Sequence, residues 1–237
     1  MTIQLVMIVR NGGETLRKSL ESVRSLVDSY CIVCAGESTD NTEDIIKEYQ
    51  PEIIKIPFEN FAQAKNAALE LATGDYILWF DHDEILINGA DKLRKYAEDG
   101  VDSVQASIVE GDPKNPIQTY LRARIWKNKP DARFVGVVHE VITNIGTSLI
   151  DKSIEVHHDH KGKGPEYYQK SNKMRIDLLN KHLQENPKDP RTTFYLAREY
   201  RDGNLPLLAI NMYARFLDLN TTFIDERWQS CYDTSLC

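Results

Sequence analysis

Three acidic side chains and a histidine follow the most apolar stretch of the chain. Asp81, His82, Asp83 and Glu84 come directly after the five apolar residues 76–80. In an extended segment, Asp81 and Asp83 would lie on the same side and His82 would point away. Two carboxylates arranged in this way can share a hard cation such as Mg²⁺ or Mn²⁺. The spacing therefore predicts a cation site, and a solvated acidic turn after a strand is the alternative interpretation.

The stretch before these acids predicts the element that positions them. Residues 76–80 are apolar throughout, which is typical of a parallel strand buried on both faces of a sheet. Strands are also predicted at residues 3–9, 31–35 and 52–56, and helices at 14–27, 43–49 and 61–73. These alternations predict an α/β fold with a mostly parallel, nucleotide-binding sheet. Because ligands of such sheets lie beyond the carboxyl ends of the strands, Asp81 and Asp83 would face the ligand.

The second half of the chain changes from strands to helices. Before residue 163 the pattern predicts a helix at 90–99 and strands at 103–109, 121–126, 134–142 and 154–160. His139 and Glu140 interrupt the strand at 134–142. Later residues predict helices at 167–185, 192–201 and 205–219.

The helical part has the spacing of a tetratricopeptide unit. Residues that fall at its large and small positions are Leu196, Ala197, Tyr200, Ala209 and Tyr213. Phe216 stands where the pattern has a small residue. We therefore predict a nucleotide-binding α/β domain over residues 1–162 and a small helical, tetratricopeptide-like tail over 163–237. Truncation of a longer parent protein is one reading of this tail.

The composition disfavours some classes of partner. A net charge of -7 disfavours nucleic acid or an anionic membrane as the main partner. No apolar run approaches the length of a transmembrane segment, and the first residues lack the pattern of a secretory signal. Cys31, Cys34, Cys231 and Cys237 are expected to be reduced thiols, because no second close pair completes a zinc site. We therefore expect a soluble, cytoplasmic protein.

Four further segments follow one another in order: Ile8-Val9-Arg10-Asn11, Ser38-Thr39-Asp40-Asn41-Thr42, Phe61-Ala62-Gln63-Ala64-Lys65-Asn66 and Asp81-His82-Asp83-Glu84. Together they resemble glycosyltransferase family 2, whose members have the GT-A fold. This resemblance implies that residues 1–162 are a nucleotide-sugar-binding and catalytic domain. Later segments are similar to a subgroup that includes lipopolysaccharide-core glucosyltransferases and peptide glycosyltransferases with tetratricopeptide tails: Arg124-Ile125-Trp126, Gly136 and Val138-His139-Glu140. The resemblance covers residues 3–160, and the tail extends it to residue 220.

This resemblance implies a metal-dependent, inverting glycosyltransferase. Such an enzyme moves a sugar from a nucleotide diphosphate sugar, here expected to be a UDP-hexose, to a glycan, lipid-linked or protein acceptor. Mn²⁺ or Mg²⁺ would act as a Lewis acid and neutralise the leaving diphosphate. In the family the second aspartate of this motif, here Asp83, contacts the metal directly, and the first, here Asp81, lies near the ribose and the metal waters. His158, with His160 in reserve, would complete the metal shell, and a solvated strand end is the alternative for both.

The resemblance also assigns residues to the nucleotide-sugar donor. They are Val9, Arg10, Asn11, Glu37, Asp40, Lys65, Asn66, Asp81 and His82. Ala35 or Gly36 stands where the family usually carries an aspartate that contacts the nucleobase, so Glu37 or Asp40 would substitute. Lys65 stands where arginine is common, and it can offset phosphate charge as a point charge without a bidentate fork.

The acceptor side needs a carboxylate that takes the proton from the acceptor hydroxyl. Its place in the last of the similar segments makes Glu140 the candidate base, with Asp131 and Asp159 as rivals. Holding His139 or the acceptor is an alternative role for Glu140. His139 and Trp126 are assigned to substrate binding, and Trp126 would stack on a sugar. The alternative role of Trp126 is packing against the helical tail.

Three further side chains near these sites have open interpretations. Trp79 lies inside a predicted buried strand and is expected to belong to the core. Arg122 and Arg124 alternate with apolar residues, as in a strand with one solvent or ligand face. The two arginines therefore either bind phosphate or solvate the strand.

Two other functions are compatible with the same motifs. A sugar-phosphate nucleotidyltransferase shares the sheet and the acidic turn, but it needs a glycine-rich, basic phosphate loop of which residues 10–13 are only a fragment. A scaffold protein with an inactive sheet would instead recruit a protein partner, or a second copy, through its helical tail. Because a bound ligand stabilises the folded protein, absent stabilisation by nucleotide-sugars would favour the scaffold.

Overall fold

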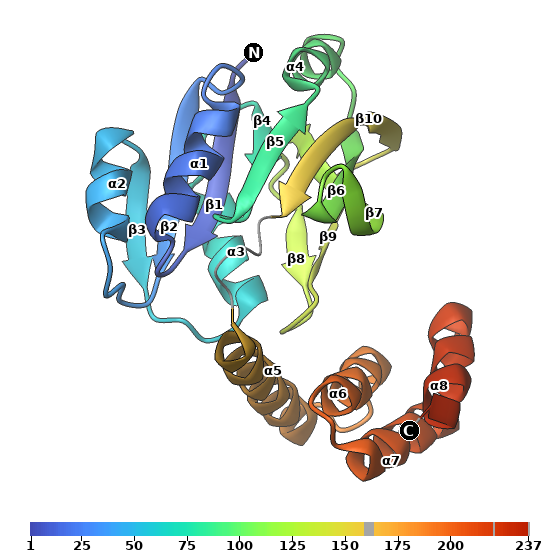
Figure 1. Cartoon of the computed structure of the whole chain (residues 1–237). Coiled ribbons are helices and arrows are strands. Elements are labelled where there is room, and N and C mark those ends of the chain that lie inside the picture. Colours follow the sequence, from blue (N-terminus) through green and yellow to red (C-terminus); the bar gives the residue numbers. More distant parts are fainter. Residues whose placement is uncertain (159–163, 220, 237) are drawn as a thin grey trace. The chain divides into compact units, whose positions relative to one another are not determined.

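The structure is a computed structural model that describes residues 1–158, 164–219 and 221–236. These residues form two compact units (Figure 1). The first unit comprises the described residues of Met1–Glu59, Gln63–Phe134 and Ile142–Lys161. The second comprises those of Asn60–Ala62, Val135–Val141 and Gly162–Cys237. The assignment of a catalytic domain to residues 1–162 and of a tail to 163–237 stays a prediction.

The first part of the chain alternates strands and helices because turn residues separate its apolar runs. The elements are β1 (Ile3–Val9), α1 (Gly13–Val23), β2 (Ser29–Ala35), α2 (Thr42–Glu48), β3 (Glu52–Ile56), α3 (Phe61–Leu71) and β4 (Tyr76–Trp79). The strands are parallel neighbours in the order β3-β2-β1-β4. β1 and β4 are buried on both faces, as their continuous apolar sequences predict.

The sheet continues with strands of both directions. The next elements are β5 (Glu84–Asn88), α4 (Ala90–Glu98), β6 (Ser103–Asp112), β7 (Asn115–Lys127) and β10 (Ser148–His158). The order of the eight-stranded sheet is β3-β2-β1-β4-β7-β6-β10-β5, in which β7 and β5 run antiparallel to their neighbours. The predicted α/β fold with a mostly parallel central sheet is therefore confirmed. The pattern does not predict β5, because its first buried residue is the charged Glu84.

A hairpin replaces the predicted single strand at residues 134–142. β8 (Arg133–Val135) and β9 (Val141–Thr143) form a separate two-stranded sheet. His139, between them, has a left-handed backbone with φ 52°, which a continuous strand does not allow. His139 and Glu140 therefore lie in a hairpin loop.

One polar side chain inside β1 fixes the start of β4. Gln4 is fully buried, and its Oε1 accepts hydrogen bonds from the backbone amides of Thr73 at 2.8 Å and Gly74 at 3.1 Å. A Cβ on Gly74 would lie 2.6 Å from the Cβ of Gln4, so this approach requires glycine. The contact sets where β4 begins, and hence where the acidic residues after β4 emerge.

The second unit is built around α5 (Pro165–Glu185), α6 (Pro190–Asp202), α7 (Pro206–Asp218) and α8 (Ile224–Leu236). α5, α6 and α7 begin with proline, which the first helical turn accepts because its N–H groups have no partner within the helix. Phe216 is buried with Phe194 and Tyr213 between α6 and α7, so the large residue at this position fills the core. α8 lies beyond the helices that the sequence predicts. The tetratricopeptide-like character of these helices remains a prediction.

No helix in the described parts of the chain is long and apolar enough to cross a membrane.

Candidate functional site

The acidic residues after β4 form a tight turn instead of the predicted extended segment. The backbone amide of Glu84 donates to the carbonyl of Asp81 at 3.0 Å, which closes the turn. The alternation of side chains along a strand therefore does not set their directions, and this part of the prediction is wrong. Asp81 Oδ1 lies 3.5 Å from Lys65 Nζ and accepts from Trp79 Nε1 at 3.3 Å.

A buried ion pair holds both ends of this turn. Arg124 of β7 donates to the two carboxylate oxygens of Glu84 at 2.6 and 2.8 Å, and the residues are 1% and 0% exposed. Arg124 also donates to the carbonyl of Trp79 at 3.2 Å, and Glu84 accepts from the amide of Asp81 at 2.8 Å. Burial raises the pKa of Glu84, and the charge of Arg124 opposes this rise.

The sequence does not predict this pair. The two interpretations of Arg124, as a phosphate ligand and as a side chain that solvates the strand, are both wrong. The structure buries the guanidinium against a carboxylate that lies 40 residues earlier in the chain. A signal was present, because Glu84 and Arg124 both lie in the segments that resemble the family. A charged residue in a buried strand needs an opposite charge, and these segments contain one.

Strand pairing brings His158 to the turn. His158, at the end of β10, pairs with Glu84 of β5 and with Glu110 of β6. Its Nε2 lies 3.3 Å from Asp83 Oδ2, and its Nδ1 lies 3.8 Å from Glu110 Oε1. Burial lowers the pKa of His158, but the hydrogen bond and charge of Asp83 outweigh burial, so the pKa is raised. Of the two predicted histidines, His158 is thus beside the second aspartate, whereas His160, like Asp159, lies outside the described residues.

The donor set at this turn fits a divalent cation in part. Within the described residues, no three His, Cys, Asp or Glu side chains are grouped so as to hold a metal ion. Asp83 and His158 nevertheless offer a carboxylate and an imidazole at one point, and both are ligand types that transition metals accept. A cation such as Mn²⁺ can complete its shell with water and substrate phosphate oxygens. The pair therefore fits a cation that the substrate helps to hold.

Asp81 is the carboxylate of the turn that is paired with a lysine. Burial raises its pKa, but the charges of Lys65 and Arg124 outweigh burial and lower the pKa to about 2. Lys65 is 5% exposed and lies 5.1 Å from the ring centroids of both Trp79 and Phe134. This buried ammonium group keeps Asp81 ionised and places a positive charge beside the turn.

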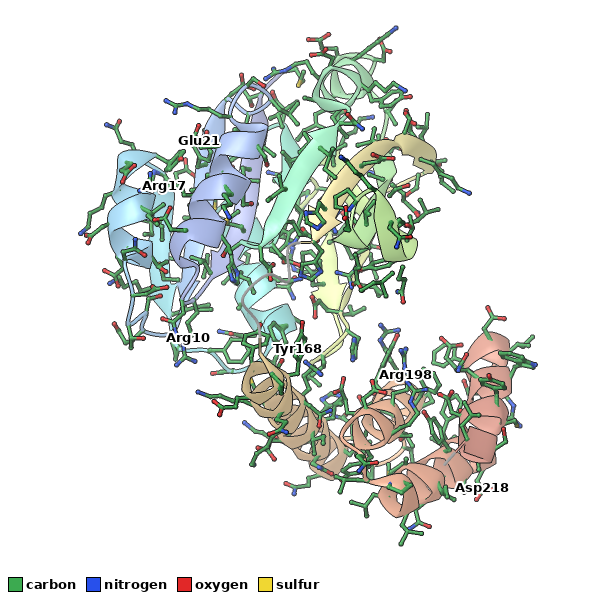
Figure 2. The ribbon with its side chains drawn as sticks, in the orientation of Figure 1. Arg10, Arg17, Glu21, Tyr168, Arg198 and Asp218 are labelled. Atoms are coloured by element: carbon green, nitrogen blue, oxygen red, sulfur yellow. The ribbon has the colours of Figure 1, made fainter. Side chains whose placement is uncertain are left out.

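The loops after β1 and β2 hold each other at the same edge of the sheet. The amide of Asn11 donates to Ser38 Oγ at 3.0 Å, and Asn11 Oδ1 accepts from the amide of Thr39 at 2.7 Å. A Cβ on Gly12 would lie 3.3 Å from His82 Cδ2, so the first loop also approaches the acidic turn. Figure 2 shows Arg10 at the end of this unit where β1 and β2 finish. The carboxyl ends of β1, β2 and β4 therefore meet, as predicted for a ligand site.

Two of the predicted donor-binding side chains are engaged within the protein. Asp40 Oδ1 accepts from the amide of Thr42 at 3.1 Å at the start of α2, and both Asp40 and Glu37 are exposed. Asn66 uses both atoms of its amide on the backbone of Phe134: Nδ2 donates to the carbonyl at 2.9 Å, and Oδ1 accepts from the amide at 2.8 Å. Asn66 thus fastens α3 to β8. Val9 is buried, so its side chain belongs to the core.

Trp79 and Trp126, the two tryptophans that the sequence places near the site, are core residues. Trp79 is buried, which confirms the prediction for it. Trp126 is only 1% exposed and packs with its ring centroid 6.2 Å from that of Phe134. A side chain this deeply buried cannot stack on a sugar, so the assignment of Trp126 to substrate binding is wrong. The physical reason is that β7 is covered on both faces at this point, as the burial of Arg124 shows.

The loop that carries His139 and Glu140 belongs to the second unit. His139 Nε2 lies 2.7 Å from an oxygen of Glu199 in α6, and its ring stacks on Tyr195 with the centroids 4.5 Å apart. Asp131, the rival base, is exposed in the first unit. The sequence gives no signal for Glu199, because its partner is 60 residues away.

Known proteins are similar to this chain in sequence. Residues 4–153 match the profile of the family described as Glycosyl transferase family 2. The chain is 32% identical over 142 residues to a TPR repeat-containing protein of Synechococcus elongatus, a match that covers 59% of this chain and 35% of that protein. It is 26% identical over 238 residues to the SPbeta prophage-derived glycosyltransferase SunS of Bacillus subtilis, covering 95% of this chain and 56% of SunS. The chain thus spans 35% and 56% of the lengths of these two relatives.

Solved structures share the fold. S. aureus TarS 1-349 superimposes with a TM-score of 0.56 at 13% identity, over 99% of this chain and 89% of that one. The mannosyltransferase PcManGT from Pyrobaculum calidifontis, solved in complex with GDP-Man and Mn²⁺, gives a TM-score of 0.52 at 13% identity, over 99% and 80% of the two chains. These likenesses support the GT-A type of fold that the sequence predicts. Since the family profile covers residues 4–153, more than half of the sequence, the chain belongs to glycosyl transferase family 2.

Proposed function

We propose that the protein is a metal-dependent, inverting glycosyltransferase that uses a nucleotide diphosphate sugar, with a UDP-hexose as the expected donor. The observation that carries this proposal is the pair formed by Asp83 and His158, 3.3 Å apart, at the carboxyl edge of the sheet where the loops after β1 and β2 also meet. SunS carries the name glycosyltransferase, TarS has been solved in complex with UDP-GlcNAc, and PcManGT with GDP-Man and Mn²⁺. A glycan, a lipid-linked acceptor or a protein would receive the sugar.

Each side chain of the site has a distinct role in this proposal. Asp83 and His158 would hold Mn²⁺ or Mg²⁺, which supplies Lewis-acid neutralisation of the leaving diphosphate. Lys65 adds a second positive charge beside the turn, and Arg10 and Glu37, where Arg10 Nε donates to the carbonyl of Glu37 at 3.3 Å, would bind the nucleoside. Asp81 stays ionised through Lys65 and would contact the ribose and the water shell of the cation.

Inverting transfer takes place in a single displacement, which requires a base on the acceptor side. Glu140 would accept the proton of the acceptor hydroxyl as that oxygen attacks the anomeric carbon and the nucleotide diphosphate leaves. The neighbouring His139 would contact the acceptor through the face of its ring that Tyr195 does not cover. The helical tail, proposed as residues 163–237, would bind a protein partner or a second copy.

The test is ligand-induced thermal stabilisation of Asp83→Asn. UDP with Mn²⁺ at about a hundred times the dissociation constant should stabilise the wild-type protein by about 2.7 kcal/mol, and Asp83→Asn should lose the Mn²⁺-dependent part. Asp28→Asn is the matched control, because Asp28 accepts from the amide of Ile3 at the opposite end of β1. That variant should melt earlier but keep the ligand-induced shift.

Two results would contradict the proposal. If Asp83→Asn kept the Mn²⁺-dependent stabilisation, the cation would not be bound at this turn. Absence of stabilisation of the wild-type protein by any UDP-, GDP- or dTDP-sugar would favour a scaffold function instead.

A further inference from the structure

We propose that Glu199 of α6 is a positioning residue for the transfer reaction, because it fixes the loop at residues 135–141 that carries Glu140. The inference rests on the proposed function and adds that a residue of the helices positions the loop of the candidate base, both within the second unit. Glu199 itself touches neither substrate nor reacting atoms; it acts through His139 and the loop.

The contacts of Glu199 are those of a fixed anchor. Its carboxylate is 2% exposed, and three side chains converge on it. His139 Nε2 lies at 2.7 Å, Arg175 Nε at 2.8 Å, and Asn172 Nδ2 donates at 2.8 Å. A buried carboxylate with a cation and two hydrogen-bond partners has one stable orientation, since any rotation leaves a charge unpaired.

The loop is held by its other residues as well. Val138, next to His139, is buried in a cluster with Leu179, Leu183 and Leu196 from α5 and α6. Arg191 Nη2 donates to the carbonyl of His139, and the Arg191 guanidinium lies 4.8 Å from the Tyr195 ring on which His139 stacks. Apolar packing, stacking and hydrogen bonds thus act on the two residues that precede Glu140.

The backbone of His139 also requires external support. Its φ of 52° is left-handed, a conformation that costs energy for residues with a side chain and persists only where surrounding contacts impose it. The bond from His139 to Glu199 is one of the contacts that impose it. Loss of that bond would let the backbone relax, and Glu140, the next residue, would move with it.

Such a displacement matters for a general base. Proton abstraction requires the base within hydrogen-bond distance of the acceptor hydroxyl, and a displacement of about 1 Å can cost on the order of a hundredfold in rate. Donor binding depends on the turn at Asp83 in the first unit, so it should be independent of Glu199. We therefore expect kcat to fall while the KM for the donor and the stabilisation by UDP with Mn²⁺ stay unchanged.

The experiment compares Glu199→Gln with Asp233→Asn. Asp233 is also a buried acid of the second unit, 1% exposed, and accepts from the hydroxyl of Tyr213 at 2.8 Å and from Arg201. Its partners are Arg201 on α6, Tyr213 on α7 and Gln229 on α8, none of them in the loop, so it matches Glu199 in burial and charge but not in contacts. Asn172→Ala is a milder second variant in case Glu199→Gln does not fold: it removes the hydrogen bonds from Asn172 Nδ2 to the carboxylate and to the backbone carbonyl of Glu199, both at 2.8 Å, but keeps the charge of Glu199.

Two readouts apply to each variant. The first is deuterium exchange of the amides at residues 135–141. The second is Mn²⁺-dependent release of the nucleotide from the best stabilising donor among UDP-glucose, UDP-N-acetylglucosamine and GDP-mannose, with water as acceptor. For Glu199→Gln we expect faster exchange of the loop and a kcat at least about tenfold lower, with the donor KM unchanged, because a general base contributes about a hundredfold or more. Asn172→Ala should show the same changes to a smaller extent, and Asp233→Asn should show neither.

The outcomes separate the inference from the proposed function. A Glu199→Gln protein with wild-type kcat, or with unchanged exchange in the loop, would overturn the inference alone. Equal losses of kcat in Glu199→Gln and Asp233→Asn would also overturn it, because the effect would then be general destabilisation of the helices. A wild-type protein that neither binds nor turns over any of the three donors would overturn the proposed function and this inference together.

Discussion

Replacing Arg124 by methionine tests the interaction that holds the acidic turn. The substitution keeps much of the aliphatic stem and removes the guanidinium. Glu84, which is 0% exposed, then faces the amide of Asp81 without its compensating cation. The folded state would have to bury an unpaired carboxylate or protonate it, so Arg124→Met should unfold more readily than the wild-type protein.

The magnitude follows from the lost contacts. They are charge-assisted hydrogen bonds to Glu84 at 2.6 and 2.8 Å and a third to the carbonyl of Trp79 at 3.2 Å. Breaking a buried pair by removing one partner costs about 3–5 kcal/mol. In a domain of roughly 150 residues each kcal/mol lowers Tm by about 2–4 °C, so the Tm of the first unit should fall by roughly 10 °C.

The assay is thermal unfolding at two pH values. Without Arg124 only the amide of Asp81 and the charge of His158 still oppose the effect of burial on the pKa of Glu84, so Glu84 holds its proton to a higher pH in the folded variant than in the unfolded chain. The folded state then binds more protons, and its stability falls as pH rises through this range. The loss of stability in Arg124→Met should therefore be greater at about pH 8 than at about pH 5.

Two controls separate the ion pair from other effects. Arg122→Met alters an exposed arginine of the same strand and should change stability by less than about 0.5 kcal/mol. The double variant Arg124→Met/Glu84→Leu removes both charges and should recover most of the Tm, since an apolar pair can replace a buried ion pair. It should not recover stabilisation by UDP with Mn²⁺, because nothing then accepts from the amide of Asp81. A Tm for Arg124→Met within about 2 °C of wild type would refute the argument.

Two further predictions concern other parts of the chain. Burial raises the pKa of Glu199, but the hydrogen bond of His139 and the charge of Arg175 outweigh burial and lower the pKa below the usual 4.5. The helical unit should therefore lose stability as pH falls through that lowered pKa, which would be measured as faster amide exchange in α6. Glu199→Gln should not show this loss of stability in acid. Asn66→Ala should lower the free energy of unfolding in urea by about 2–3 kcal/mol, because it removes two hydrogen bonds and leaves the amide and carbonyl of Phe134 unpaired. Asn66→Asp keeps the acceptor and should lower it by less. Equal losses of unfolding free energy in the two variants would contradict this account.

Local periodicity predicted the bounds of two strands. β3 has the predicted bounds, Glu52–Ile56, and β1 spans the predicted residues Ile3–Val9. The nearly continuous apolar run of β1, which ends at turn residues, leaves little choice of conformation for that strand. The position of the acids after β4 was predictable for the same reason, since the apolar run ends there.

The details of the site depend on contacts between distant residues. The alternation of basic and apolar residues around Arg124 predicts a strand with one solvent or ligand face. Ile125 and Trp126 beside it are, however, also 1% exposed, so β7 has no solvent face at this point. A charge in a strand implies solvent only when no opposite charge reaches it, and the partner Glu84 lies on β5. His158 reaches Asp83 through pairing of β10 with β5 and β6, and register shifts interrupt both pairings. No local pattern encodes that register.

The acids of the turn differ in burial, and this difference separates support from ligand binding. Glu84 and Arg124 each expose 1% of their side chains, whereas Asp83 exposes 7%, its partner His158 21% and Asp81 25%. A fully buried pair cannot exchange partners without leaving a charge uncompensated. An arriving cation and diphosphate would therefore meet Asp83 and Asp81, while Glu84 keeps the turn in place. Asp83→Asn should then remove the ligand-induced shift in Tm, whereas Arg124→Met should lower the Tm of the unliganded protein. The two variants therefore change different measurements.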